Sequence, residues 1–561
     1  MPKWAILVAL LALVLSASSC RVGNDNATLS GEAPSPYRND INPVPPAQLP
    51  DGGTLRWPLG SVPANFNIHA FDGPDISNGA VMGALMPSVF AFDTAGRPIL
   101  RSEYVELAEL TATSPEQIVT YRINPRAFWS DGTPITAADF EAQWRALNGT
   151  DPAYRVATTQ GYDKIESVAR GRGDREVVVT FAEPYADWRV LFNPLYPASS
   201  NADPLLFNAG WRDRPLQTAG PFAFERIDPA AQTIILVRNA SWWGQPAKLE
   251  RIVYRAMDSG AQIDALANDE IDFVDIGSDV DKLRRAEGSP GISVRKASAP
   301  DFAHITMNGA SEALQDVRLR RALAMGIDRR AIARALLGPL GVSTTPLGNH
   351  ILMADQAGYQ DNSGEIGMYL PERASALLDE AGWRLAGDAR AKDGENLSLR
   401  YVIRAQVAAD RQVAELVRGM LDELGVEVQI EAVPLDTFRE YIEQGNFELT
   451  TFDWFGLTFS ISTTEAIYAS VEADSPHDVG LNFARIGSPE IDQLFDRATA
   501  EFDPAKAIGI ANDIDRLIWL QVHSLPLFQR PAIVAAKSRL ANYGAFGPAS
   551  VVYEDIGFLE P

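Results

Sequence analysis

Cysteine is almost absent from this chain, because its 561 residues include only one, Cys20. No disulfide can therefore form within the chain, and no zinc site can be built from cysteines. Positive charge is also scarce, since 49 Lys and Arg oppose 73 Asp and Glu for a formal net charge of −24. Such an acidic surface repels phosphate backbones and anionic lipids, which argues against nucleic-acid binding and against direct adhesion to a membrane.

Patterns for catalysis and metal binding are missing as well. None of the five histidines lies at HxxxH or HExxH spacing, and the chain has no GxSxG motif, no P-loop and no GxGxxG opening a helix. The acidic run 269–281 lacks the alternation and glycine of an EF-hand loop, so a solvated face is the favoured interpretation. We therefore expect no metal and no cofactor, and the sequence favours binding over catalysis.

The N-terminus has the features of an export signal. Lys3 precedes an apolar run over 4–15, which is too short to span a membrane, and small residues at 16–19 lead to Cys20. This arrangement resembles a bacterial lipobox, which implies that the thiol of Cys20 is acylated and becomes the mature N-terminus. The match is imperfect, because the pattern prefers a larger aliphatic residue at Ala17. The alternative is plain secretion, with cleavage among the small residues.

The segment that follows Cys20 has the composition of a tether. Residues 21–50 contain six prolines, several Asn, Ser and Gly, and few apolar side chains. Such a segment cannot bury a core. We expect it to be a flexible connection between the N-terminus and a folded body.

Beyond Asp51 the sequence alternates short strands with amphipathic helices, which is typical of an α/β protein. Thr136 and Asp139 form a capping box that predicts the start of a helix. The apolar spacing over 408–424 predicts a second helix, which Gly425 should end. No repeat of 20–50 residues recurs, so a solenoid is not expected.

Four aromatic residues lie close together near position 455: Phe452, Trp454, Phe455 and Phe459. Large aromatic side chains near turns either fill a core or line a ligand cleft. The residues alone leave both interpretations open.

Several segments, taken in order, resemble one family. They are 120–123 with 129–140, Ala219–Phe222, Asp269–Asp272, Met307–Asn308, Asp316–Leu323, Gly326–Arg329, Leu377–Trp383 and Ser488–Asp492. Together they are similar to the family 5 extracytoplasmic solute-binding proteins of ABC importers, the oligopeptide- and dipeptide-binding group. The resemblance covers the chain from about Gly52 to the C-terminus.

The resemblance implies an α/β fold of the periplasmic-binding-protein type II kind, with two lobes around a cleft and an inserted subdomain. Chain crossings would lie near Ala299–Pro300 and Leu525–Pro526, and the lobes would close on the ligand by a hinge motion. The implied division is signal peptide 1–20, tether 21–50, lobe I 51–95, 197–299 and 525–561, inserted subdomain 96–196 and lobe II 300–524.

The resemblance also implies a set of ligand-binding residues, and two of its positions depart from the family pattern. The family's peptide binders place an Asp three residues after the cleft tryptophan, where it pairs with the ligand's amino terminus, and this chain has Leu457. Many place an Arg three residues before it, and this chain has Thr451. Asp453 or Asp72 is an alternative partner for the amino terminus. The implied set is Asp72, Gly73, Pro74, Asp75, Tyr154, Asn193, Asn308, Trp454, Phe455 and Leu457.

The resulting expectation is a monomeric lipoprotein on the outer face of the cytoplasmic membrane. It would capture peptides in the cleft and deliver them to an ABC permease, without enzyme activity. The alternative is a family-5-like lipoprotein that binds a glycolipid or another non-peptide ligand and regulates envelope synthesis. An envelope enzyme is the least favoured interpretation.

Overall fold

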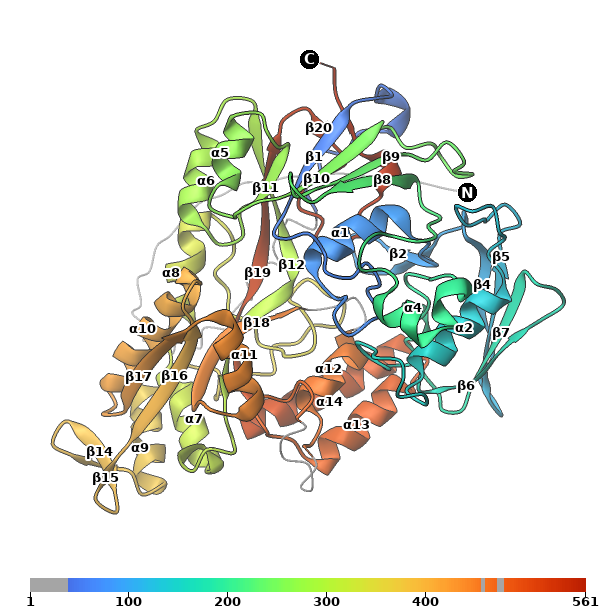
Figure 1. Cartoon of the computed structure of the whole chain (residues 1–561). Helices are drawn as coiled ribbons and strands as arrows, with labels where there is room; N and C mark the ends of the chain where they lie inside the picture. The colour runs from blue at the N-terminus through green and yellow to red at the C-terminus, as the bar shows by residue number, and fades with distance from the viewer. Residues whose placement is uncertain (1–38, 456–459, 472–478, 561) are drawn as a thin grey trace, which may run out of the picture. The chain divides into compact units, whose positions relative to one another are not determined.

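The computed structural model describes residues 39–455, 460–471 and 479–560 (Figure 1). Cys20 and Leu457 lie outside these residues, as does Phe459. Among the helices that are described, none is long and apolar enough to cross a bilayer.

A four-stranded sheet joins the beginning of the folded chain to a segment nearly 200 residues later. Its order is β1 (Thr54–Leu59), β10 (Arg251–Ala256), β9 (Thr233–Arg238) and β8 (Phe222–Asp228). β1 and β10 pair in parallel, and the other neighbours are antiparallel. Helix α1 (Ile76–Leu85) is tied to this sheet, because the Tyr254 hydroxyl donates to the Ala80 carbonyl at 2.9 Å. β1 begins just after Asp51, where the alternation of strands and helices is expected to start.

A second four-stranded sheet, wholly antiparallel, is built within residues 105–181. Its order is β4 (Val105–Ala112), β5 (Gln117–Ile123), β7 (Glu176–Phe181) and β6 (Ile165–Arg170). Helix α2 (Ala137–Leu147) begins at the predicted capping box, in which the Thr136 amide donates to the Asp139 carboxylate at 2.7 Å. Phe140 and Leu147 on α2 are fully buried, as their spacing predicts.

The largest sheet has six strands and contains the two longest strands of the described chain. Its order is β11 (Phe273–Asp275), β19 (Ser524–Lys537), β12 (Ile292–Met307), β18 (Leu449–Phe455), β16 (Ser398–Arg404) and β17 (Glu427–Val433). Figure 1 shows β12 and β19 running side by side through the middle of the view. They pair antiparallel over most of their lengths, so they link distant parts of the sequence into one ladder.

Helices pack around this sheet as the sequence predicts. α10 (Ala408–Asp422) buries Val413, Val417 and Leu421, and Gly425 follows it with a φ of 78°, a conformation that favours glycine. The other α-helices described within residues 317–521 are α7 (Val317–Gly326), α8 (Arg329–Leu337), α9 (Pro371–Glu380), α11 (Leu435–Gln444), α12 (Ser460–Tyr468), α13 (Pro489–Thr499) and α14 (Pro504–Gln521).

Shorter elements complete the described part of the chain. They are α3 (Ala198–Asn201), α4 (Pro204–Ala209), α5 (Gln262–Ala267), α6 (Val280–Glu287), β2 (Phe90–Phe92), β3 (Pro98–Leu100), β13 (Arg384–Ala386), β14 (Ala389–Lys392), β15 (Glu395–Asn396), β20 (Leu540–Ala541), β21 (Gly557–Phe558) and five 3₁₀ turns, Pro46–Gln48, Trp188–Val190, Ala313–Gln315, Gly338–Leu340 and Tyr553–Asp555. α5 and α6 contribute Ile263, Leu266 and Leu283 to the core around the six-stranded sheet.

The pairing of β12 with β19 is interrupted at one place. Ser298 lies opposite Pro531, but Phe302 lies opposite Gln529, so three residues of β12 face one residue of β19. Bulges of this kind bend a strand and redirect its side chains. The interruption contains Ala299 and Pro300, where the first crossing is expected. Arg530 of β19 lies opposite this interruption. The second crossing is expected at Leu525–Pro526, nearer the start of β19, so the interruption does not coincide with it. The lobe boundaries stay a prediction.

Candidate ligand-binding site

Trp454, the central residue of the expected cleft wall, lies near the end of β18. It is half-buried, and its indole stacks on Phe483 and on His304, with ring centroids 5.8 Å apart in both pairs. Phe452 meets the same indole edge-on at 5.1 Å. The structure confirms the core role for Phe452, whereas a ligand-lining role for Trp454 stays a prediction. Phe452 is buried in a core, and Trp454 closes that core while keeping part of its surface exposed.

The neighbouring residue, Asp453, lies on the opposite face of β18, because side chains alternate along a strand. There its carboxylate is 3.6 Å from the Arg404 guanidinium and 3.5 Å from the Arg530 guanidinium. Arg530 also pairs with Asp301 at 2.6 Å, and Arg404 with Asp410 at 2.6 Å. Asp453 is thus one member of a network of three carboxylates and two guanidinium groups.

Burial gives this network a distinct electrostatic character. Asp301 and Asp410 are only 7% and 5% exposed, and burial raises the pKa of both carboxyl groups. The arginines offset that effect, since each lies between two carboxylates. A cavity adjoins the network and is lined by Asp453, Arg530 and Thr451, together with side chains of α8 and α10. The Thr451 hydroxyl donates to the His304 carbonyl at 2.8 Å.

The loop 72–75 is held in place by contacts with its own surroundings. Asp72 accepts a hydrogen bond from Asn65 at 2.9 Å and pairs with Arg212 at 2.6 Å. Partial burial raises the pKa of Asp72, but these two partners outweigh that effect and hold the pKa below its ordinary value. Asp75 caps α1 by accepting from the Ser77 amide at 3.0 Å. The Pro74 side chain between them is exposed.

Gly73 is required by a close approach of two backbone segments. A Cβ atom at this position would lie 1.9 Å from the Asn67 carbonyl oxygen, closer than any real contact. The Asn78 side chain reinforces the turn, because its amide donates to the Gly73 carbonyl at 2.8 Å and to the Asn65 carbonyl at 2.7 Å. The loop is therefore preorganised before any ligand binds.

Three other members of the implied set use their polar atoms within the protein. The Tyr154 hydroxyl donates to the Asn201 carbonyl at 2.9 Å. The Asn193 amide accepts from the Phe90 amide at 3.1 Å and donates to its carbonyl at 3.3 Å. Asn308 is 2% exposed and donates to two backbone carbonyls at 2.9 Å. These contacts position neighbouring segments, and a role in ligand contact stays a prediction for all three.

For the last two members the structure describes less. The backbone of Phe455 pairs with Asp301 at the end of β18. Leu457 lies outside the described residues.

Two hydrogen bonds join the inserted segment to the helices α12 and α13. The Ala186 amide donates to the Thr499 carbonyl at 2.7 Å, and the Gln160 side chain donates to the Ser462 carbonyl. Ser462 is on α12 and Thr499 ends α13. These contacts connect segments that the resemblance assigns to the inserted subdomain and to lobe II, and that assignment stays a prediction.

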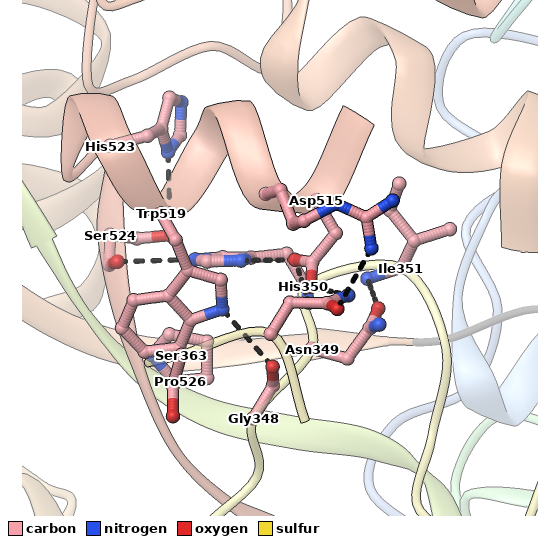
Figure 2. Close-up of polar contacts among 12 residues, drawn as sticks. Gly348, Asn349, His350, Ile351, Ser363, Asp515, Trp519, His523, Ser524 and Pro526 are labelled. Atoms are coloured by element: carbon pink, nitrogen blue, oxygen red, sulfur yellow. Dashed lines mark hydrogen bonds and ion pairs between the residues drawn. The ribbon is translucent and has the colours of Figure 1, made fainter. Parts of the chain in front are cut away.

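A buried polar cluster that the sequence analysis missed lies beside β19 (Figure 2). His350 and Asp515 are fully buried, and their side chains are 2.7 Å apart. The other ring nitrogen of His350 donates to the Ser524 carbonyl at 3.1 Å, because a carbonyl can only accept. Figure 2 also shows the Trp519 indole donating to the Gly348 carbonyl. The cluster fixes the loop 348–351 against α14 and against the first residue of β19.

One sequence signal could have revealed this cluster. Asn512, Asp515 and Trp519 recur at helical spacing on the otherwise apolar buried face of α14. Buried polar residues need partners, and Asn512 and Asp515 both find one in Asn362. Because Asn512 and Asp515 form these hydrogen bonds inside the protein, we interpret both as residues that pack and position the neighbouring loop. No group of three or more potential metal ligands occurs among the described residues.

Comparison with known proteins identifies a family profile and several relatives that match this chain. The sequence profile of the bacterial extracellular solute-binding proteins, family 5, matches residues 104–470. The chain is 43% identical to the oligopeptide-binding protein OppA of Mycobacterium tuberculosis over 526 residues, which is 93% of this chain and 87% of OppA. It is 27% identical to the probable monoacyl phosphatidylinositol tetramannoside-binding protein LpqW of the same species, over 77% of this chain and 68% of LpqW.

A solved structure supports the same assignment. The periplasmic EDTA-binding protein EppA superposes with a TM-score of 0.85 at 26% identity, covering 93% of this chain and 98% of EppA. The expected α/β fold of the two-lobed solute-binding kind is confirmed by this match together with the sequence profile. The chain belongs to the bacterial extracellular solute-binding proteins, family 5.

Proposed function

We propose that this protein is the substrate-binding component of an ABC importer and that it captures peptides for delivery to a membrane permease. The observation that carries the proposal is the 43% identity to an oligopeptide-binding protein over 93% of the chain. The solute-binding family and the lack of a recognisable catalytic motif support binding without enzyme activity. We further propose that the protein acts as a monomer outside the cytoplasmic membrane.

The proposed ligand contacts are the half-buried face of Trp454, the preorganised loop 72–75 and the residues that follow β18. Both acids considered as partners for a peptide amino terminus are already engaged, Asp453 by two arginines and Asp72 by Arg212. A carboxylate held in this way is a poor partner for a further ammonium group. This supports recognition of a peptide through its backbone and apolar side chains, with little contribution from its terminal charge.

A glycolipid or other non-peptide ligand is the less favoured alternative. LpqW, whose name records a glycolipid, is 27% identical over 77% of this chain. OppA is more similar and covers more of the chain.

Mass spectrometry of the ligand that co-purifies with the untagged protein tests the proposal directly. We expect short peptides, released on denaturation and absent from a control purification of an unrelated protein. A bound glycolipid, with no peptide, would contradict peptide capture and support the alternative. Conversion of an added ligand during the measurement would contradict a purely binding role.

We also propose that Cys20 carries a lipid anchor, because it is the only thiol and follows a short apolar run with small residues. Two acyl chains hold a protein at a bilayer, whereas a single chain binds only marginally. Cys20→Ala should therefore move the protein from the membrane fraction to the soluble fraction of cells. If the variant stays in the membrane fraction as fully as the unaltered protein, the anchor lies elsewhere.

A further inference from the structure

A solvent-open groove lies among helices that pack around the six-stranded sheet. Its walls come from α7, α9, α14 and the loop 362–366, and its volume is about 430 Å³. None of its lining residues belongs to the implied peptide-binding set. Its size falls within the range of small-molecule sites, roughly 300–1,000 Å³.

The rim of this groove carries several arginines, although the protein as a whole is strongly acidic. Three arginines line it, Arg321, Arg373 and Arg516, and the one acidic lining residue is Glu365. The whole chain carries a formal charge of −24, so this concentration of guanidinium groups is local. Arg373 and Arg516 are paired with Glu380 and Asp513, so the anion-binding capacity of this rim depends mainly on Arg321.

Arg321 is held in place without being neutralised. Its Nε and one terminal nitrogen donate to the Leu520 carbonyl at the end of α14, at 3.1 and 2.6 Å. Among the described residues it forms no ion pair, unlike Arg373, which pairs with Glu380 at 3.3 Å. A fixed guanidinium with an uncommitted nitrogen is preorganised to bind a carboxylate.

The interior of the groove is apolar. Met325, Ile366, Leu377 and Leu520 line it together with Trp519. Leu520 is 50% exposed, so part of this apolar lining faces water. Covering this surface with an alkyl chain would remove it from water.

We propose that this groove is a second ligand site, which binds an amphipathic carboxylate such as a medium-chain fatty acid. The carboxylate lies on Arg321 and Arg373, and the alkyl chain lies along Met325, Leu377 and Leu520. The site is separate from the peptide contacts, so it does not depend on the proposed transport function.

Octanoate binding to the full-length protein, measured by calorimetry, tests the proposal. We expect one saturable site for octanoate, and at least tenfold weaker binding of acetate, which lacks the chain, and of octyltrimethylammonium, which has the opposite charge. Arg321→Gln and Arg373→Gln should each weaken octanoate binding about tenfold, which is about 1.4 kcal/mol. Among the described residues, Arg373 forms an ion pair with the half-exposed Glu380 alone, so its loss should leave the fold intact.

Arg318→Gln is the matched control. Arg318 lies on the same helix and is 50% exposed, but it pairs with Asp316 and does not line the groove. It should bind octanoate like the unaltered protein. Absence of saturable octanoate binding, equal affinity in Arg373→Gln and the unaltered protein, or equal binding of octyltrimethylammonium would each overturn the proposal.

Discussion

The two faces of β18 have different environments, one aromatic and one charged, although the residues that define them are neighbours in sequence. On one face, Trp454 stacks between Phe483 and His304 and stays partly exposed. On the other, Asp453 is enclosed by Arg404 and Arg530. The charged side chains are paired with each other, whereas part of the aromatic surface is exposed to solvent. From this comparison we propose that charge at this strand supports the sheet and that recognition depends on the aromatic face.

Removing a guanidinium group from the charged face of β18 should have the largest energetic effect, and the effect should be a loss of folding stability. Arg530→Gln would leave Asp301 and Asp453 without their shared guanidinium, and an unpaired, largely buried carboxylate is costly. We expect the free energy of unfolding to fall by about 3 kcal/mol. Urea denaturation measures this. The control Arg145→Gln removes an exposed pair on α2 and should cost about 0.5 kcal/mol or less.

The pH dependence of that loss sharpens the test. Burial raises the pKa of Asp301, so the folded protein binds a proton there more readily than the unfolded chain does. Protonation removes the uncompensated charge, so the difference between Arg530→Gln and the unaltered protein should shrink as the pH falls through the raised pKa. A difference that grows on acidification would contradict this account of the charged face.

Breaking the aromatic face should act on affinity instead. Trp454→Ala removes the half-buried indole, and loss of an aromatic anchor costs about 2 kcal/mol of binding, or roughly thirtyfold in Kd. Calorimetry with the co-purified peptide measures it. Trp383→Ala, which removes a half-buried tryptophan beside Lys392, should leave the Kd unchanged. If both variants bind alike, Trp454 is a packing residue only.

The sequence predicted the elements whose signals are local. The capping box at Thr136 and Asp139 and the helix ended by Gly425 need only residues within a few positions of one another. The contacts that decide the site are not local. Asp453 meets arginines from two other strands, and His350 meets Asp515 across 165 residues of sequence. Helical spacing indicates that Asp515 lies on a buried face, but no periodicity or motif identifies its partner.

The family resemblance supplied the fold but could not supply these partners. It directed attention to Asp453 and Asp72 as alternatives, because both are acids near the implied cleft. It could not show that each is already paired, since that depends on where Arg530 and Arg212 lie in space. It also gave no indication that Asn308 is buried with its amide bonded to backbone carbonyls.

Adding a carboxylate to the site should create the charge preference that the protein otherwise lacks. Leu457→Asp places an acid where the family's peptide binders have one. A free peptide should then bind about tenfold more tightly than its N-acetylated form, a difference of about 1.4 kcal/mol. Leu457→Asn is the matched control, because it has the same shape without the charge, and it should show no such preference.

The central claim is that the terminal charge of a peptide contributes little to its binding. Calorimetry on the unaltered protein with matched free and N-acetylated peptides tests it most directly. Because Asp453 and Asp72 are already paired with arginines, the two forms should bind with Kd values within about twofold, or roughly 0.4 kcal/mol. A loss of more than about tenfold on acetylation would contradict the account. It would show that a carboxylate of the cleft already holds the peptide's amino terminus.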